Sequence, residues 1–112
     1  MDLGLKVTQN NGVAVLAVTG EVDVATAPRL REQIVSLVAD GNARIVCDLE
    51  SVDFLDSTGL GVLVGALKRA RTHGGDLVLV LTQPRILKVF EITGLLQVFE
   101  IYDSVDAAIA GG

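Results

Sequence analysis

The chain has 112 residues, half of them apolar, which is enough for one domain with a hydrophobic core. Its net charge of −5 would repel the phosphate backbone of nucleic acid, so we expect no nucleic-acid partner. No apolar run reaches the ~18 residues of a membrane-spanning helix, and the first residues lack the basic and apolar segments of a secretory signal. We therefore expect a single domain over residues 1–112 that does not act in a membrane.

The first third of the chain predicts a hairpin and then a helix: strands over residues 5–9 and 13–19, and a helix over 26–39. Asn10-Asn11-Gly12 predicts the hairpin turn, because Asn and Gly accept a positive φ at little cost. Gly20 is expected to end the second strand, and Thr26 to cap the helix.

The rest of the chain predicts alternating strands and helices: strands over 45–49, 77–81 and 98–102, helices over 58–72 and 84–94, and a short helix capped by Asp103 that runs through Ile109. Such alternation indicates an α/β fold with right-handed crossovers. We expect a mostly parallel sheet of about five strands, with an antiparallel N-terminal edge strand and about four helices, in the order β-β-α-β-α-β-α-β-α. The pattern leaves open whether the helices cover one face of the sheet or both.

Cysteine and histidine are too scarce for a disulfide or a typical transition-metal site. The single Cys47 lies in a strand pattern, which favours a buried structural thiol. The only histidine, His73, lies far from it in the sequence, and the carboxylates would hold at most a loose divalent ion. We expect no metal and no cofactor.

Acidic residues follow two of the predicted strands. The carboxyl ends of parallel strands meet at one edge of the sheet, so Gly20-Glu21-Val22-Asp23 and the run from Asp53 to Ser57 are expected to lie together. Carboxylates would then surround Ser57. Taken singly, Asp56 or Ser57 is a helix cap and the other acids are a solvated turn. Their convergence on one edge favours a binding surface.

Catalysis at Ser57 is not expected. A serine nucleophile needs a positioned base, and His73 lies about 22 Å along the predicted helix at 1.5 Å per residue. Position 55 is Leu, where a nucleophile elbow requires glycine. Gly59-Leu60-Gly61 resembles a dinucleotide-binding loop only in part, because the third glycine, Gly65, comes one residue late. Gly59 and Gly61 are expected instead to permit a tight turn and close approach of a partner.

A phosphate on Ser57 fits the predicted position better than catalysis does. The N-terminus of a helix offers free N–H groups and a partial positive charge. Phosphorylation adds about −1.5 to −2 charges to an edge that is already acidic. It would therefore change what docks there without unfolding the chain.

The chain resembles the bacterial anti-sigma factor antagonists, which are single STAS domains. The resemblance covers essentially the whole chain and includes four segments: Gly20-Glu21-Val22-Asp23, Ile45-Val46-Cys47-Asp48-Leu49, the run from Val52 to Gly61, and Phe90-Glu91-Ile92-Thr93-Gly94-Leu95. The run Asp-Ser-Thr-Gly-Leu-Gly at a strand-to-helix junction is fairly specific to that family.

The resemblance implies a phosphorylation switch in the bacterial cytoplasm. In that family the anti-sigma factor is a serine kinase that phosphorylates the serine corresponding to Ser57, and Asp56 would support this acceptor. The unphosphorylated form binds the anti-sigma factor and frees the sigma factor, and a PP2C-type phosphatase restores it. The acceptor implied is Ser57, and Thr58 supplies a second hydroxyl in the same motif. The partner-binding residues implied are Asp23, Asp56, Ser57, Thr58, Gly59 and Gly61.

Two other functions remain open at this stage. One is a STAS accessory subunit of an ABC lipid transporter or of a stress-signalling assembly. The other is a small-ligand or nucleotide-binding domain that uses the edge near Gly59.

Overall fold

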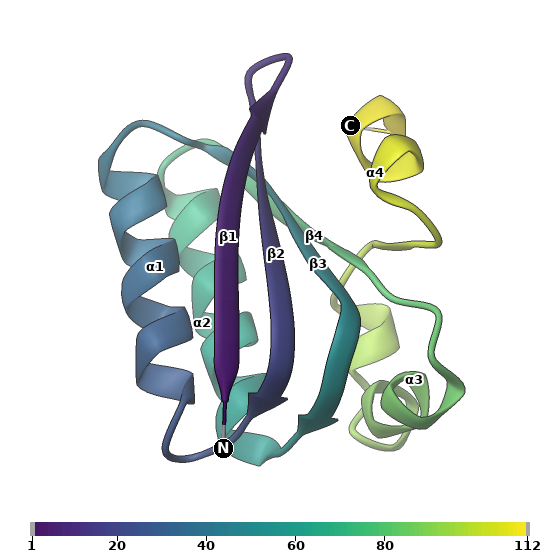
Figure 1. Cartoon of the computed structure of the whole chain (residues 1–112). Coiled ribbons are helices and arrows are strands. Elements are labelled where there is room, and N and C mark those ends of the chain that lie inside the picture. The colour runs from purple at the N-terminus through teal and green to yellow at the C-terminus, as the bar shows by residue number, and fades with distance from the viewer. Residues whose placement is uncertain (1, 112) are drawn as a thin grey trace.

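The structure, a computed structural model, describes residues 2–111 and contains a five-stranded sheet in the order β1-β2-β3-β4-β5 (Figure 1). The first two strands are antiparallel and the other neighbours are parallel. This confirms the predicted α/β class, including its antiparallel edge strand. The strands are β1 (Leu3–Asn10), β2 (Val13–Val22), β3 (Arg44–Leu55), β4 (Asp76–Val80) and β5 (Ile101–Tyr102).

Helices cover both faces of the sheet, which answers the question that the sequence left open. The helices are α1 (Ala27–Ala39), α2 (Ser57–Thr72), α3 (Pro84–Ile92) and α4 (Val105–Gly111), with a 3₁₀ turn η1 (Leu95–Gln97). Successive strand residues point to opposite faces. Cys47 therefore joins the large core under α1 and α2, while Val46 joins the smaller core under α4.

The third helix completes the large core. Phe90 of α3 is fully buried and packs edge-to-face on Phe99, with ring centroids 5.9 Å apart. The fully buried Cys47 has its thiol pKa raised to about 12 by desolvation, so it stays protonated and unreactive. The expectation of a buried structural thiol is confirmed.

The two strands that lead to the predicted site are longer than the sequence indicated. β2 continues past Gly20 to Val22, and β3 continues past Leu49 to Leu55. Gly20 has a φ of +92° and lies at an irregularity in the β2–β3 pairing. A Cβ at Gly20 would collide with the Asp2 carbonyl, so the close approach of the chain requires glycine there. The strand does not end at Gly20: the pairing continues beside a bulge in which β3 carries one extra residue, Asp53.

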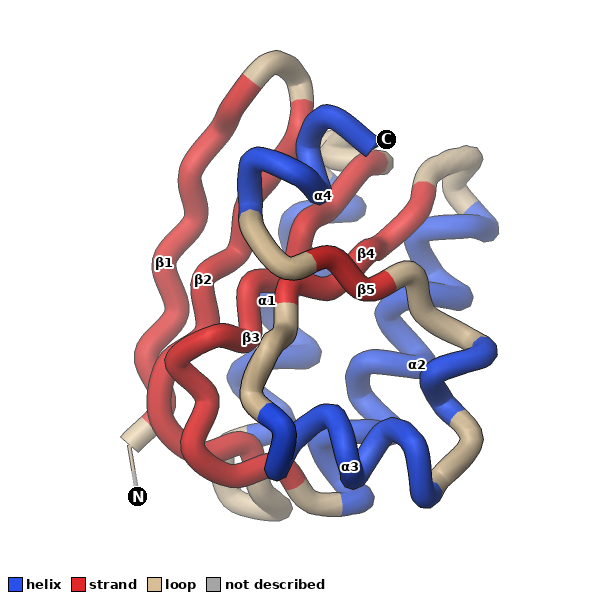
Figure 2. Tube along the Cα trace, turned by 90° about the vertical axis from the view of Figure 1, so that its right-hand side faces the viewer, coloured by secondary structure: helices blue, strands red, loops and turns tan. Residues whose placement is uncertain are grey.

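The C-terminal part differs more from the prediction, as Figure 2 shows at the short strand β5. α3 ends at Ile92 and Gly94 follows with a φ of +75°. The amides of Val98 and Phe99 both donate to the Leu95 carbonyl, at 3.0 and 3.2 Å, so neither pairs with the sheet. The predicted strand over 98–102 therefore shrinks to two residues.

The sequence predicts Asp103 as the cap of α4, and this prediction is wrong. The Ser104 hydroxyl, and not the Asp103 carboxylate, accepts the Ala107 amide, at 3.1 Å. The two residues are adjacent and both are common caps, so composition alone did not separate them.

The loop between β4 and α3 is bonded to the second half of β3. β4 ends at Val80, which pairs with Asp48, so the rest of β3 has no strand on that side. The Gln83 side-chain amide donates instead to the carbonyls of Glu50 and Val52, at 2.8 and 2.9 Å. The Arg85 guanidinium donates to the Asp53 carbonyl, at 2.6 Å. These bonds hold the segment that leads to Ser57.

None of the helices in residues 2–111 combines the length and the apolar character that crossing a membrane requires.

Candidate functional site

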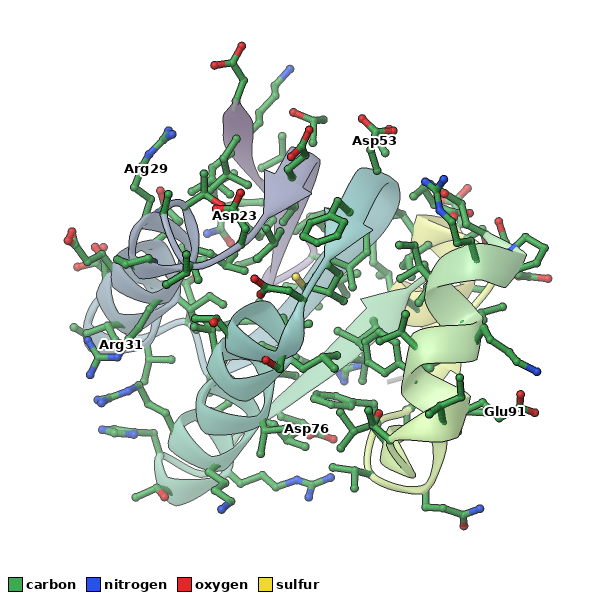
Figure 3. All side chains as sticks on the ribbon, turned by 90° about the horizontal axis from the view of Figure 1, so that it is seen from below. Asp23, Arg29, Arg31, Asp53, Asp76 and Glu91 are labelled. Atoms are coloured by element: carbon green, nitrogen blue, oxygen red, sulfur yellow. The ribbon has the colours of Figure 1, made fainter. Side chains whose placement is uncertain are left out.

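The residues predicted to converge do lie at one edge of the sheet. Asp23 and Asp56 are the first residues after β2 and β3, whose last residues, Val22 and Leu55, are partners in the ladder. The Asp56 amide donates to the Val22 carbonyl at 3.2 Å. Figure 3 looks onto this end of the molecule and shows Asp23 beside the start of α1 and Asp53 at the tip of β3. We call the set Asp23, Asp56, Ser57, Thr58, Gly59 and Gly61 the Ser57 edge.

Asp23 organises the turn between β2 and α1. One of its carboxylate oxygens accepts the amides of Ala25 and Thr26, at 2.9 and 3.0 Å. These bonds, the Thr26 amide first, hold the pKa of Asp23 below its ordinary value, so the side chain stays ionised. The site therefore keeps a fixed negative charge beside the start of α1.

Thr26 stands at the position predicted for the cap of α1, but it does not cap that helix. Its buried hydroxyl donates to the Glu21 carbonyl at 2.7 Å and accepts the Asp23 amide at 2.9 Å. Both bonds are made to the backbone of the turn between β2 and α1. They fix the conformation of this turn, which contains Asp23 and Val24.

The cap of α2 is Asp56. Its carboxylate accepts the Gly59 amide at 3.0 Å, which settles the choice between Asp56 and Ser57 as the capping residue. Ser57 is the first residue of α2 and is exposed, and its hydroxyl makes no hydrogen bond with the rest of residues 2–111. A free hydroxyl thus stands at a capped helix N-terminus.

The two glycines of the motif have different surroundings. Gly59 is buried, and a Cβ there would lie 2.6 Å from a methyl carbon of Leu55 and 2.7 Å from one of Val22. It therefore lets α2 approach the ends of both strands. Gly61 is exposed and has nothing within 4 Å of its would-be Cβ. The fold requires glycine at the first position only.

Sequence reasoning missed two apolar side chains beside these residues. Val24, in the Asp23 turn, is 72% exposed, and Phe54, near the end of β3, is 48% exposed. Strand alternation offered a signal for Phe54, because its neighbour Leu55 faces the core and Phe54 must face away. Exposed large apolar groups next to a charged turn are typical of the centre of a protein interface.

Among residues 2–111, no histidine lies near Ser57. His73 lies at the opposite end of α2, where its Nδ1 is 2.9 Å from the Arg69 carbonyl. In the same residues, no three or more His, Cys, Asp or Glu side chains are grouped as a metal site requires.

Comparisons with known proteins agree with this geometry. Residues 5–108 match the family model of the STAS domain. The anti-sigma-B factor antagonist of Bacillus subtilis is 40% identical over 101 residues, which cover 90% of this chain and 92% of that protein. Its namesake in Staphylococcus aureus is 35% identical over 106 residues, 95% of this chain and 98% of the relative.

A solved structure is similar in both fold and sequence. The crystal structure of an anti-sigma factor antagonist from Mycobacterium paratuberculosis superposes with a TM-score of 0.90 at 33% identity, covering 98% of this chain and 93% of that one. These names describe regulatory binding proteins, as the sequence indicated, and not enzymes. The chain belongs to the STAS domain family, in its group of anti-sigma factor antagonists.

Proposed function

We propose that this chain binds an anti-sigma factor through the Ser57 edge and that a phosphate on Ser57 ends the binding. The observation that carries the proposal is the free, exposed hydroxyl of Ser57 at the first position of α2, next to a cap that Asp56 alone provides. The names of the relatives supply the class of partner. Release of a sigma factor is the consequence of that binding.

Ser57 is a better acceptor than Thr58. Both side chains are exposed, but Thr58 lines a groove between α1 and α2, while Ser57 does not. A kinase must place the hydroxyl oxygen in line with the γ-phosphate of ATP, which requires an acceptor that protrudes. The transferred phosphoryl group then bonds to Ser57 Oγ, the hydroxyl proton passes to a base of the kinase, and ADP leaves.

The surroundings of Ser57 explain why a phosphate would end binding. Asp23 and Asp56 already make the edge acidic, so the partner's face must be basic around an apolar centre that meets Val24 and Phe54. A phosphoserine adds about −1.5 to −2 charges and bulk inside this contact. In a packed contact, the bulk of the phosphate and its desolvation beside two carboxylates oppose docking by more than the basic face of the partner favours it, while the helix N-terminus tolerates the phosphate within the fold.

The resemblance extends the proposal to the enzymes that act on Ser57. The anti-sigma factor itself would be the serine kinase, and a PP2C-type phosphatase would hydrolyse the phosphoserine and restore binding. A single domain over residues 1–112 and a site of action in the bacterial cytoplasm belong to the same proposal.

Calorimetric titration against the cognate anti-sigma factor tests the proposal. The unmodified chain and Ser57→Ala should bind with equal affinity, and the phosphorylated chain at least roughly tenfold more weakly, which corresponds to about 1.4 kcal/mol. Mass spectrometry after incubation with the anti-sigma factor and ATP should find phosphate on Thr58→Ala and none on Ser57→Ala. Equal binding by the phosphorylated chain and Ser57→Ala would exclude the switch.

A further inference from the structure

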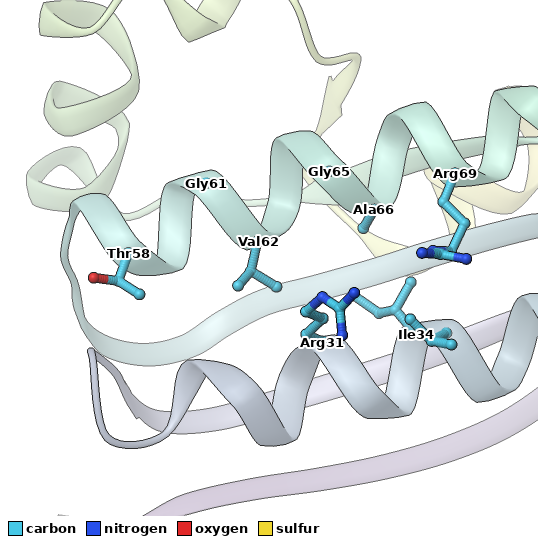
Figure 4. Close-up of a pocket in the computed structure, with 9 residues that line it drawn as sticks. Arg31, Ile34, Thr58, Gly61, Val62, Gly65, Ala66 and Arg69 are labelled. Atoms are coloured by element: carbon cyan, nitrogen blue, oxygen red, sulfur yellow. The ribbon is translucent and has the colours of Figure 1, made fainter.

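A groove of about 320 Å³ lies between α1 and α2 on the flank of the helix pair, and it shares Thr58 and Gly61 with the Ser57 edge (Figure 4). Its floor is apolar: Ile34 and Ala66 are buried, and Val35 and Val62 are half-buried. The volume is at the lower end of the range of small-molecule pockets. The groove is therefore large enough for the body of a small apolar ligand.

The groove stays open because two residues in the middle of α2 have no side chain. Gly61 and Gly65 are exposed, line the groove, and have nothing within 4 Å of a would-be Cβ. Glycine inside a helix costs about 1 kcal/mol relative to alanine. Unlike Gly59, neither glycine is required by the packing of the chain, so their effect is to leave this space empty.

Two arginines stand on opposite walls of the groove, Arg31 on α1 and Arg69 on α2. Neither guanidinium forms an ion pair or a hydrogen bond within residues 2–111, although the chain carries a net charge of −5. By contrast, Arg71 on the same helix pairs with Asp76 at 3.3 Å. Guanidinium groups bind carboxylates through paired hydrogen bonds, so the two walls are suited to a carboxylate.

We infer that the groove between α1 and α2 binds a small monocarboxylate with an aliphatic body. Its chain would lie on the floor, over Ala66 and along Gly61 and Gly65, and its carboxylate would bind Arg31 and Arg69. A partner protein is a poorer fit, because a stable protein interface buries well over about 1,000 Å² and this hollow is small. The inference does not depend on the proposed function of Ser57.

Nuclear magnetic resonance of the ¹⁵N-labelled full chain tests the site, with octanoate as the probe. Octanoate should cause saturable shifts at the amides of Val35, Gly61 and Gly65 and at the side chains of both groove arginines. A dissociation constant on the order of 1 mM or lower is expected. Octylammonium, which has the same apolar body and the opposite charge, should not produce these shifts.

Variants of the groove residues show whether octanoate binds specifically in the groove or only contacts the surface there. A Cβ at Gly65 meets nothing within 4 Å, so the side chain of Gly65→Leu can enter the groove. This variant should weaken octanoate binding at least tenfold while its circular dichroism spectrum stays that of a folded chain. Arg31→Gln and Arg69→Gln should each weaken binding roughly threefold, as loss of an exposed charge pair does. Arg71→Gln is the matched control and should bind as the wild type does.

Three results would overturn the inference: no saturation up to the order of 10 mM octanoate, unchanged affinity in the Arg31→Gln/Arg69→Gln double variant, or shifts centred on the exposed apolar residues Ile92, Leu96 and Val98. If Gly65→Leu fails to fold, the octanoate affinity of the Arg31→Gln/Arg69→Gln double variant is sufficient to test the inference. Ser57→Ala should bind octanoate normally, so failure of the phosphorylation switch and failure of this site are distinguishable.

Discussion

The Asp56 carboxylate accepts the amide of Gly59 at 3.0 Å, across the first turn of α2. This bond caps the start of the helix. The Ser57 hydroxyl, which lies between the two residues in sequence, makes no hydrogen bond within residues 2–111. Structural support and the proposed phosphorylation therefore fall on different residues. A phosphate on Ser57 would replace no bond that the fold uses.

Removing the cap should lower stability without touching Ser57. Asp56→Ala should reduce the free energy of unfolding by about 1 kcal/mol, because one amide at the start of α2 loses its acceptor. Urea denaturation measures the change. Asp103→Ala is the control, since Asp103 precedes α4 without accepting a hydrogen bond within residues 2–111. Equal losses in the two variants would contradict the assignment of the cap.

Alanine at the two motif glycines should have opposite effects on stability. Gly59→Ala should destabilise the chain by about 1–3 kcal/mol, because its Cβ meets Val22 and Leu55 in a packed core. Gly61→Ala should stabilise it by up to about 1 kcal/mol, since the added methyl group enters open space on a helix. Chemical denaturation of both variants distinguishes them, and a destabilised Gly61→Ala would contradict the packing described for α2.

Asp23 should contribute to the acid sensitivity of the fold. The folded chain holds its pKa below the ordinary value of 3.8, so the unfolded chain binds the proton more tightly. Its stabilising effect is therefore complete above about pH 4 and is lost as the pH falls through the folded pKa.

The Asp23→Asn variant measures this effect. The difference in unfolding free energy between the wild type and Asp23→Asn should shrink as the pH falls from about 6 to about 3. Asp53→Asn is the control, because the Asp53 side chain accepts no hydrogen bond within residues 2–111. A difference that grows at low pH would have the wrong sign for a depressed pKa.

Phosphorylation of Ser57 should leave the fold intact. An anion at a helix N-terminus gains roughly 0.3–1 kcal/mol, and this offsets repulsion from Asp56. The far-UV circular dichroism spectrum should not change, and the melting midpoint should move by less than about 5 °C. Loss of the helix signal on phosphorylation would mean that the switch acts by unfolding α2.

Val24 and Phe54 should contribute more to partner affinity than their charged neighbours. Phe54→Ala should weaken binding to the anti-sigma factor roughly tenfold or more, because truncating a buried interface aromatic costs at least about 1–2 kcal/mol. Val24→Ala should have a smaller effect in the same direction. Ile92→Ala, at the end of α3, is the control, because Ile92 is as exposed as Val24 and more exposed than Phe54. An equal loss there would place the interface elsewhere.

The sequence predicted the helices and strands in which apolar residues recur at a regular spacing. It missed the parts of the fold that depend on tertiary contacts. α1 and α2 have clear apolar stripes, and both were placed within about a residue of their bounds. The extension of β3 to Leu55 was missed, because Ser51 and Asp53 are polar and exposed. Pairing of Ser51 with Thr19, and of Phe54 and Leu55 with the end of β2, shows that the strand continues, with Asp53 as an unpaired extra residue. The loss of residues 98–100 from β5 followed from the local turn at Leu95.

The candidate site was predictable where it depends on topology. Parallel strands must end at one edge, so Asp23 and Asp56 were expected together, as observed. The roles within that edge were not predictable, because they depend on which oxygen reaches which amide. Thr26 was expected to cap α1 and instead closes the Asp23 turn, a bond pattern visible only in the folded chain.

The Gln83 amide, which bonds to the carbonyls of Glu50 and Val52, also has a consequence for self-association. Beyond Asp48, β3 has no neighbouring strand on its β4 side, and such an open edge is a template for strand addition by another molecule. Gln83 and Arg85 occupy the carbonyls that an incoming strand would need. The loop that supports the Ser57 edge thereby also protects the sheet from aggregation through its longest strand.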